Sequence, residues 1–101
     1  MAWKLIKGVN KMNIYDKITS CEKIVCFIEG NNINSMSIFY KKEMLKSQFY
    51  YETLSFIDNT AKNLPIKCIT ICGYETENSK ELKSLFTGSH IKLQKLIRGV
   101  I

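Results

Sequence analysis

The chain has 101 residues, 46% of them hydrophobic and 24% charged, which is the composition of a folded globular protein rather than a disordered one. A chain of this length forms one hydrophobic core, so we expect residues 1–101 to be a single domain. Its uncharged apolar runs are far shorter than the roughly twenty residues of a membrane span, so we expect no membrane partner and a cytoplasmic protein.

The net charge of +6 is concentrated at the two ends of the chain. No acidic residue occurs among residues 1–15 or 82–101, and the basic residues there are Lys4, Lys7, Lys11, Lys83, Lys92, Lys95 and Arg98. If the ends meet in space, these cations form a patch that attracts phosphates, so we take them as candidate nucleic-acid contacts. A solvated surface is the alternative. Fourteen of the fifteen cations are Lys, so the Arg fork that suits base recognition is mostly absent.

The first elements along the chain are predicted to be a short helix and a strand. Residues 1–12 precede them and are interpreted as a basic arm or an extra strand. Asn13 can cap a helical turn that runs through Ile18. Residues Lys23–Glu29 form a near-continuous apolar run with β-branched side chains, which is typical of a strand covered on both faces. This strand ends at Gly30-Asn31-Asn32.

Residues 34–63 allow two interpretations. The second half has the spacing of a helix, with a shared face formed by Tyr50, Leu54, Ile57 and Ala61. This helix ends at Asn63-Leu64-Pro65. The first half alternates like a strand over residues 34–40, which would make a hairpin with the preceding strand. We favour a helix there instead, because residues 41–46 are good helix formers.

The last third of the chain begins with a second apolar strand at Ile66–Cys72, which ends at Gly73. A short helix is predicted from Asn78 or Ser79 to Phe86, with Gly88 as its stop. The final segment stays open between a third strand at 90–93 and a helix whose apolar positions are Leu93, Leu96, Ile97 and Val100.

Together these elements predict an α/β fold, a small Rossmann-like β-α-β-α-β domain of three layers with a mainly parallel sheet. The alternative is an α+β fold with a β-hairpin at 23–40. In a parallel sheet with right-handed crossovers, both strand-end turns lie on one edge, where ligands bind. Glu29 ends the first strand, and Glu75 and Glu77 follow the second. Gathered carboxylates can hold Mg²⁺, which activates water against a phosphodiester.

Two stretches resemble a known family. Ile24-Val25-Cys26-Phe27-Ile28-Glu29-Gly30-Asn31-Asn32 resembles the opening motif of NYN domains, relatives of the PIN-like ribonucleases, whose first strand runs into Asp-Gly-Asn-Asn. Residues 69–75 are similar to the second strand of that family. The resemblance implies a PIN-like fold over residues 23–98, a divalent metal and an RNA substrate. On it we name Glu29 and Glu75 as candidate catalytic residues, Glu29, Glu75 and Glu77 as candidate Mg²⁺ ligands, and Asn31 and Asn32 as candidate nucleic-acid contacts.

The sequence departs from the family in its acids. Glu29 stands where the family has Asp, and no acid follows Glu81, where the family places its later acidic motifs. These departures favour binding over catalysis. We therefore expect a small basic RNA-binding module resembling a partial PIN-like nuclease. The alternative is a protein-binding inhibitor or adaptor of the phage or mobile-element type, which docks through a sheet edge or an aromatic helix.

The remaining reactive side chains favour structural roles. Cys21, Cys26, Cys68 and Cys72 lack the tight knuckle spacing of a zinc site and are interpreted as core thiols in a reducing compartment. His90 next to Ser89 is not by itself a catalytic pair, because such pairs need a third, orienting group. The run Phe49-Tyr50-Tyr51 can offer stacking surfaces to bases, although aromatic residues at helical spacing are more often buried.

Overall fold

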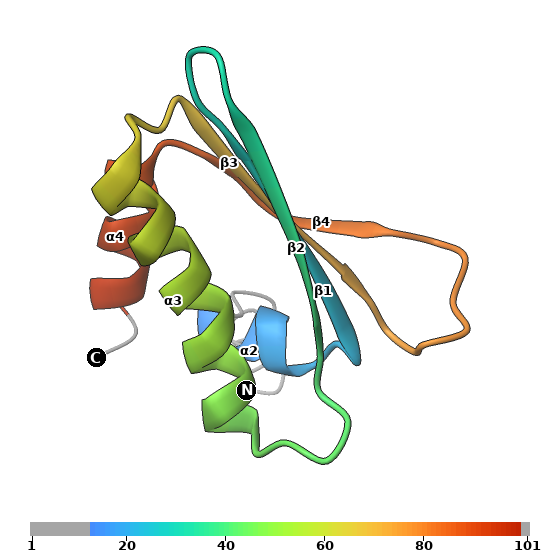
Figure 1. Ribbon diagram of the computed structural model, residues 1–101. Helices are drawn as coiled ribbons and strands as arrows, with labels where there is room; N and C mark the ends of the chain where they lie inside the picture. Colours follow the sequence, from blue (N-terminus) through green and yellow to red (C-terminus); the bar gives the residue numbers. More distant parts are fainter. Residues whose placement is uncertain (1–12, 100–101) are drawn as a thin grey trace, which may run out of the picture.

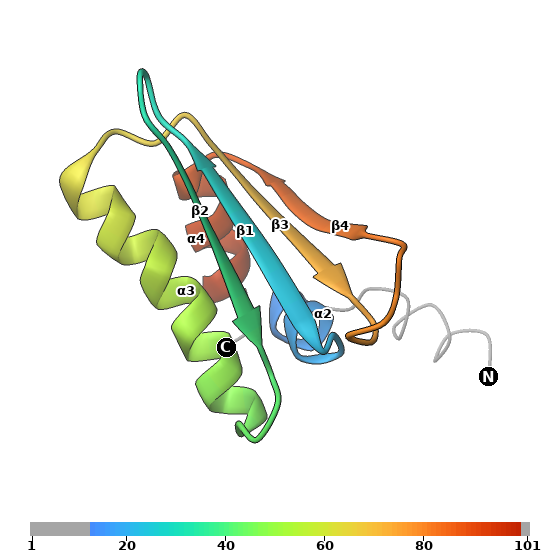
Figure 2. The same ribbon diagram turned by 45° about the vertical axis from the view of Figure 1, so that its right-hand side comes forward.

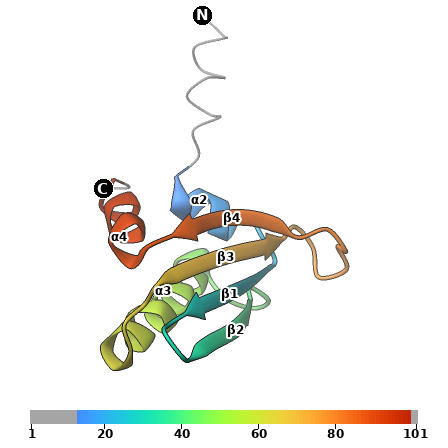
Figure 3. The ribbon, with the colours of Figure 1, turned by 90° about the horizontal axis from the view of Figure 1, so that it is seen from above.

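The computed structural model describes residues 13–99, which form a four-stranded sheet with three helices on one of its faces (Figures 1 and 2). In chain order the elements are α2 (Ile14–Thr19), β1 (Lys23–Glu29), β2 (Asn34–Tyr40), α3 (Lys46–Asn63), β3 (Cys68–Tyr74), β4 (Lys83–Gly88) and α4 (His90–Arg98). The strand order is β2-β1-β3-β4, and every neighbouring pair is antiparallel. Figure 3 shows β2 and β4 as the outer strands. The predicted arm or strand at 1–12 lies outside the described residues.

The predicted Rossmann-like, mainly parallel sheet is wrong, and the fold class is α+β. The segment 34–40, for which we favoured a helix, is strand β2, and Asn31-Asn32 forms the tip of a β1–β2 hairpin. The good helix formers that follow make a turn, because Glu43 has a left-handed backbone (φ 62°) that no α-helix can contain. The element order on which the resemblance to NYN domains depended is therefore absent from the described residues.

The central strands were predicted at nearly the right positions and in the wrong kind of sheet. In β1, Ile24, Cys26 and Ile28 are buried against the helices. Val25 lies on the other face, yet it is only 8% exposed, because β2 and β3 flank it on both sides. A central strand can thus be apolar on both faces although helices cover only one of them. This apolar pattern is typical of parallel sheets, which is why the sequence predicted one.

The local helix signals were mostly confirmed. Asn13 caps α2 by accepting a hydrogen bond from the Asp16 backbone N–H at 2.8 Å, as its side chain predicted. Helix α3 ends at Asn63 just before Leu64-Pro65. The predicted helix at 78–86 is wrong, because residues 83–88 form β4, and the open question about the C-terminal segment is settled by helix α4.

The core lies between the sheet and the three helices. Its buried members come from every element except β2, whose Phe39 is partly buried against them. They are Ile14, Ile18, Cys21, Ile24, Cys26, Ile28, Phe49, Ile57, Ile69, Ile71, Phe86 and Leu93. Gly30 and Gly73 have no positive φ angle, and their role is to let neighbouring side chains pack close to the backbone. A Cβ at Gly30 would lie 2.5 Å from Leu64 Cδ1, and one at Gly73 would lie 2.4 Å from Cys21 Sγ. None of the described helices has the length and apolar character needed to cross a bilayer.

Candidate nucleic-acid interface

The acids predicted to share a metal ion are not brought together. Because β1 and β3 are antiparallel, Glu29 pairs with Cys68 at one end of the sheet, while Glu75 follows Tyr74 at the other. The strand rise places the two carboxylates roughly 20 Å apart. Glu75 instead forms an ion pair with Lys83. Within residues 13–99, no three side chains of the metal-binding types are clustered, so the described part of the chain assembles neither the predicted Mg²⁺ site of Glu29, Glu75 and Glu77 nor the catalytic pair.

The predicted basic contacts are dispersed as well. The hydrogen bond to Glu75 and the negative charge of Glu75 raise the pKa of Lys83. The positive charge of Lys83 is therefore already balanced by Glu75. Lys92, Lys95 and Arg98 are exposed along α4, on the helical side of the sheet. The predicted contacts Asn31 and Asn32 are exposed at the hairpin tip, next to the end of α3. Lys4, Lys7 and Lys11 lie outside the described residues.

The sheet face turned away from the helices is not covered by any element between residues 13 and 99 (Figures 1 and 2). We call it the open face, and the registers of β2, β1 and β3 arrange it in four rows. The rows are Tyr40-Lys23-Tyr74, Ile38-Val25-Cys72, Met36-Phe27-Thr70 and Asn34-Glu29-Cys68. The open face is therefore aromatic and cationic at one end, apolar in the middle, and polar with one acid at the other end.

Large side chains on the open face are exposed to a degree that is unusual for a strand interior. The exposed fractions are 42% for Phe27, 57% for Met36, 43% for Ile38 and 47% for Tyr40. Ile24, Cys26 and Ile28 on the opposite face of β1 are at most 1% exposed. A contiguous exposed apolar patch of this kind marks an interaction surface more often than scattered single residues do.

The first row places a cation between two aromatic rings. Lys23 Nζ lies 4.1 Å from the centroid of the Tyr74 ring and 5.9 Å from that of Tyr40, both within cation–π range. No carboxylate of the described residues forms an ion pair with Lys23. Lys23 is thus a cation on an aromatic platform whose charge is not cancelled by a neighbouring described acid.

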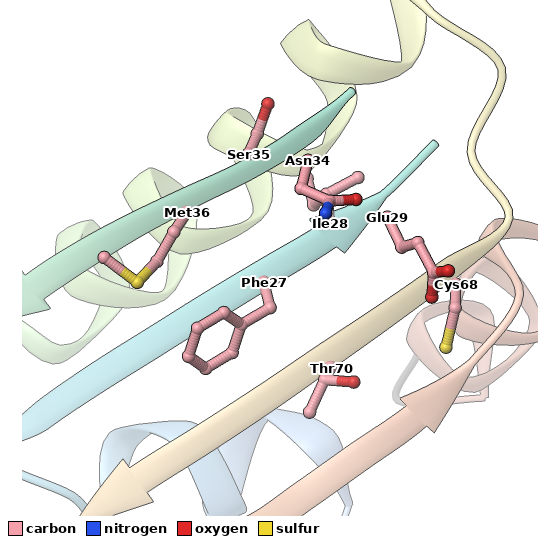
Figure 4. A pocket seen from close by; sticks show the side chains of 8 residues that line it. All are labelled: Phe27, Ile28, Glu29, Asn34, Ser35, Met36, Cys68 and Thr70. Atoms are coloured by element: carbon pink, nitrogen blue, oxygen red, sulfur yellow. The ribbon is translucent and has the colours of Figure 1, made fainter. Parts of the chain in front are cut away.

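A shallow hollow of about 280 Å³ lies towards the other end of the open face (Figure 4). Phe27, Met36 and Thr70 lie side by side there on three neighbouring strands, and Glu29 lies beside Cys68 at its edge. The hollow has an apolar floor and one carboxylate at its rim. It suits a flat apolar or aromatic group, and the carboxylate disfavours a phosphate at this end.

Neither the thiols nor the histidine forms a reactive site. Burial raises the pKa of the Cys26 thiol to about 12 and shifts those of Cys21 and Cys72 upward, so these three thiols are buried and protonated. The predicted core position is confirmed for Cys21 and Cys26, whereas Cys72 is buried on the open face and Cys68 is only partly buried there. His90 begins α4, and its Nε2 lies 3.4 Å from Asp58 Oδ1 on α3. Ser89 Oγ accepts a hydrogen bond from the Lys92 backbone N–H and therefore acts as a helix cap.

The aromatic platform was missed at the level of sequence. Of the predicted stacking residues Phe49-Tyr50-Tyr51, Phe49 is fully buried and only Tyr51 is well exposed, on α3. The Tyr50 ring packs edge-on against the Tyr15 ring, with the ring centroids 4.9 Å apart. Tyr40 and Tyr74 lie 34 positions apart in the chain, and only the pairing of both strands with β1 brings them to either side of one lysine. The available signal was the alternation of Met36, Ile38 and Tyr40, which marks one face of a strand.

Comparison of the chain with family models, with curated proteins and with solved structures gives no match.

Proposed function

We propose that this protein binds single-stranded nucleic acid, RNA in particular, on the open face of its sheet. The observation that carries the proposal is the row Tyr40-Lys23-Tyr74, in which a lysine lies between two tyrosine rings on neighbouring strands. Exposed aromatic rings on a sheet can stack on unpaired bases, and a cation beside them can meet the phosphate that joins those bases.

The dimensions of the face fit a short single strand. Neighbouring strands are about 4.8 Å apart, so Tyr40 and Tyr74, which are separated by β1, present rings about 10 Å apart. Phe27 lies four residues along β1 from Lys23, roughly 13 Å further on. Three rings spread over this area can stack two or three bases, as on other four-stranded RNA-binding sheets. The proposal includes no catalytic step, since the acids expected to perform one lie at opposite ends of the sheet.

The net charge supports phosphate binding in a less specific way. The chain carries +6, and the acid-free helix α4 contributes three of the cations. Because α4 lies on the helical side of the sheet, we assign it to long-range attraction of the strand and not to contact with stacked bases.

The test is fluorescence anisotropy with a labelled 12-nucleotide poly(U) strand, poly(dT) of the same length and a duplex of mixed sequence. Stacking is worth about 1–3 kcal/mol per base, so Tyr40→Leu and Tyr74→Leu should each weaken single-strand binding by about fivefold or more. Tyr51→Leu is the matched control, because Tyr51 is 70% exposed on α3, away from the open face. Equal affinities for all three variants, or equal binding of duplex and single strand, would refute the proposal.

A second candidate function is docking of a protein partner on the same face. The observation that favours it is the apolar centre formed by Phe27, Met36 and Ile38. Salt separates the two functions, because the affinity for a single strand falls with a slope of about −0.7 per phosphate contact in log–log coordinates, whereas an apolar interface changes little.

A further inference from the structure

Strand β2 is an edge strand without the usual protection. It pairs with β1 on one side and with no described strand on the other. Its sequence, Asn-Ser-Met-Ser-Ile-Phe-Tyr, contains no charge, proline or glycine, and its register with β1 runs without a bulge from Asn34 to Tyr40. Proteins normally blunt such edges with lysines, prolines or bulges, because a bare edge is a template for another strand.

The hydrogen bonds at the two ends of the hairpin show which backbone groups of β2 are free. The Gly30 N–H donates to the Ile33 carbonyl at 2.8 Å, and the Lys41 N–H donates to the Glu22 carbonyl at 3.0 Å. In an antiparallel ladder every second residue bonds to the neighbouring strand, so the odd-numbered residues face β1. The N–H and C=O groups that point outward belong to Asn34, Met36, Ile38 and Tyr40, and no described backbone group bonds to them outside the strand.

The other edge of the sheet contains a charge, a glycine and a bulge. Strand β4 begins with Lys83, and its pairing with β3 is interrupted by a register shift at Ile71/Cys72. A bulged and charged strand is poorly suited to pairing, so the two edges are not equivalent.

We propose that β2 pairs with β2 of a second copy of this chain, antiparallel, about a two-fold axis at Ser37. This register matches Met36 with Ile38 and Asn34 with Tyr40 of the second copy, so all of the outward N–H and C=O groups are bonded. The match of Met36 with Ile38 also joins the apolar centres of the two open faces into one surface.

The charges at the ends of β2 decide between antiparallel and parallel pairing. Lys41 and Lys42 directly follow the strand. Parallel pairing would place these lysines beside their copies, where like charges repel. Antiparallel pairing places the two lysine pairs at opposite ends of the shared ladder, beyond the roughly 10 Å range of screened repulsion.

The first measurement is the molar mass of the intact chain by light scattering after size-exclusion chromatography. Protein concentrations from about 5 to 200 µM cover the dissociation constants expected for an interface of modest size. We expect a dimer whose dissociation is promoted by Ser37→Lys and equally by Ser37→Glu, since each variant places two like charges opposite each other on the two-fold axis. An equimolar mixture of the two variants should restore the dimer, because Lys then faces Glu. A monomeric wild-type chain, or a dimer that both variants leave unchanged, overturns the proposal.

Two cysteine variants test the register. Ser37→Cys places two thiols opposite each other in a non-hydrogen-bonded pair, where Cα atoms lie about 4.5 Å apart and a disulfide can form. In the matched control Ser35→Cys, the two thiols are four residues out of register, roughly 13 Å apart, and should not cross-link. Cross-linking of both variants at similar rates would contradict antiparallel pairing at Ser37.

The design also separates this inference from nucleic-acid binding. Ser37 is on the helical side of β2 and is partly exposed, so a charge there can reach solvent without altering the open face. Circular dichroism checks that each variant is folded. A folded, monomeric Ser37→Lys chain that still binds poly(U) supports both proposals, because it loses the dimer and keeps the stacking surface.

Discussion

Substitution of Gly73 by alanine should destabilise the protein through one identifiable contact. The added Cβ would lie 2.4 Å from Cys21 Sγ and 3.1 Å from Leu85 Cδ1, well inside ordinary contact distances. Cys21 is only 2% exposed, so its sulfur has no open space into which to move. Overpacking of a core costs about 1–3 kcal/mol. The lower entropy of alanine in the unfolded chain offsets about 0.4–1 kcal/mol of this, since Gly73 does not have a positive φ.

The decisive experiment is a double-mutant cycle with Cys21→Ala. In the wild-type chain this substitution removes a buried sulfur and should lower the free energy of unfolding by about 1 kcal/mol. In the Gly73→Ala chain it should be neutral or stabilising, because the new methyl group occupies the space left by the sulfur. The two substitutions should therefore couple by about 1–2 kcal/mol.

Urea denaturation followed by far-ultraviolet circular dichroism measures all four free energies of unfolding. Gly99→Ala is the control, because a Cβ there meets its nearest atom, the Leu96 carbonyl oxygen, at 3.4 Å and causes no comparable clash. Additivity of Gly73→Ala and Cys21→Ala within about 0.4 kcal/mol would refute the packing of β3 against Cys21 described above.

Three further predictions follow from the backbone, the buried thiols and the separated acids. The left-handed backbone of Glu43 costs about 1–2 kcal/mol in a residue with a side chain. Glu43→Gly should therefore be neutral or raise the free energy of unfolding by up to about 1 kcal/mol, whereas Lys42→Gly should lower it, as measured by thermal unfolding. Burial raises the pKa of Cys26 to about 12, so the stability that depends on its protonated thiol is fully present below the unfolded pKa near 9 and is lost as the pH rises towards 12. Urea denaturation should show the free energy of unfolding falling over this pH range, and falling less steeply with pH in Cys26→Ala. Millimolar Mg²⁺ should leave the melting temperature unchanged, because Glu29 and Glu75 are far apart, and a rise in melting temperature that Glu29→Gln abolishes would contradict this.

Local signals predicted the elements better than they predicted the fold. Asn13 as a cap, Pro65 as a helix stop and the apolar run from Lys23 are readable because each acts within a few residues. Strand β4 is different, since its only large buried side chain is Phe86, and pairing with Ile71 holds it in the sheet. No periodicity within residues 83–88 contains that information.

The candidate site depended even more strongly on topology. Glu29 and Glu75 converge in a parallel sheet and diverge in an antiparallel one, although the sequence of each strand is the same in both cases. Residues 34–40 form strand β2 and not the predicted helix, and β3 then runs antiparallel to β1, so the two acids lie at opposite ends of the sheet. Conversely, the platform around Lys23 is defined by the registers of three strands, and therefore becomes visible only when all three are placed.

The strand order β2-β1-β3-β4 has a kinetic consequence. Each half of the molecule is a local hairpin followed by a helix, β1-β2-α3 and then β3-β4-α4, and each hairpin can close over a short loop. Among the described strands, β1–β3 is the one pairing that joins the halves, and it connects residues as distant in sequence as Lys23 and Tyr74. Non-local pairing of this kind slows folding, so we expect the docking of the two hairpins to set the refolding rate measured by stopped flow.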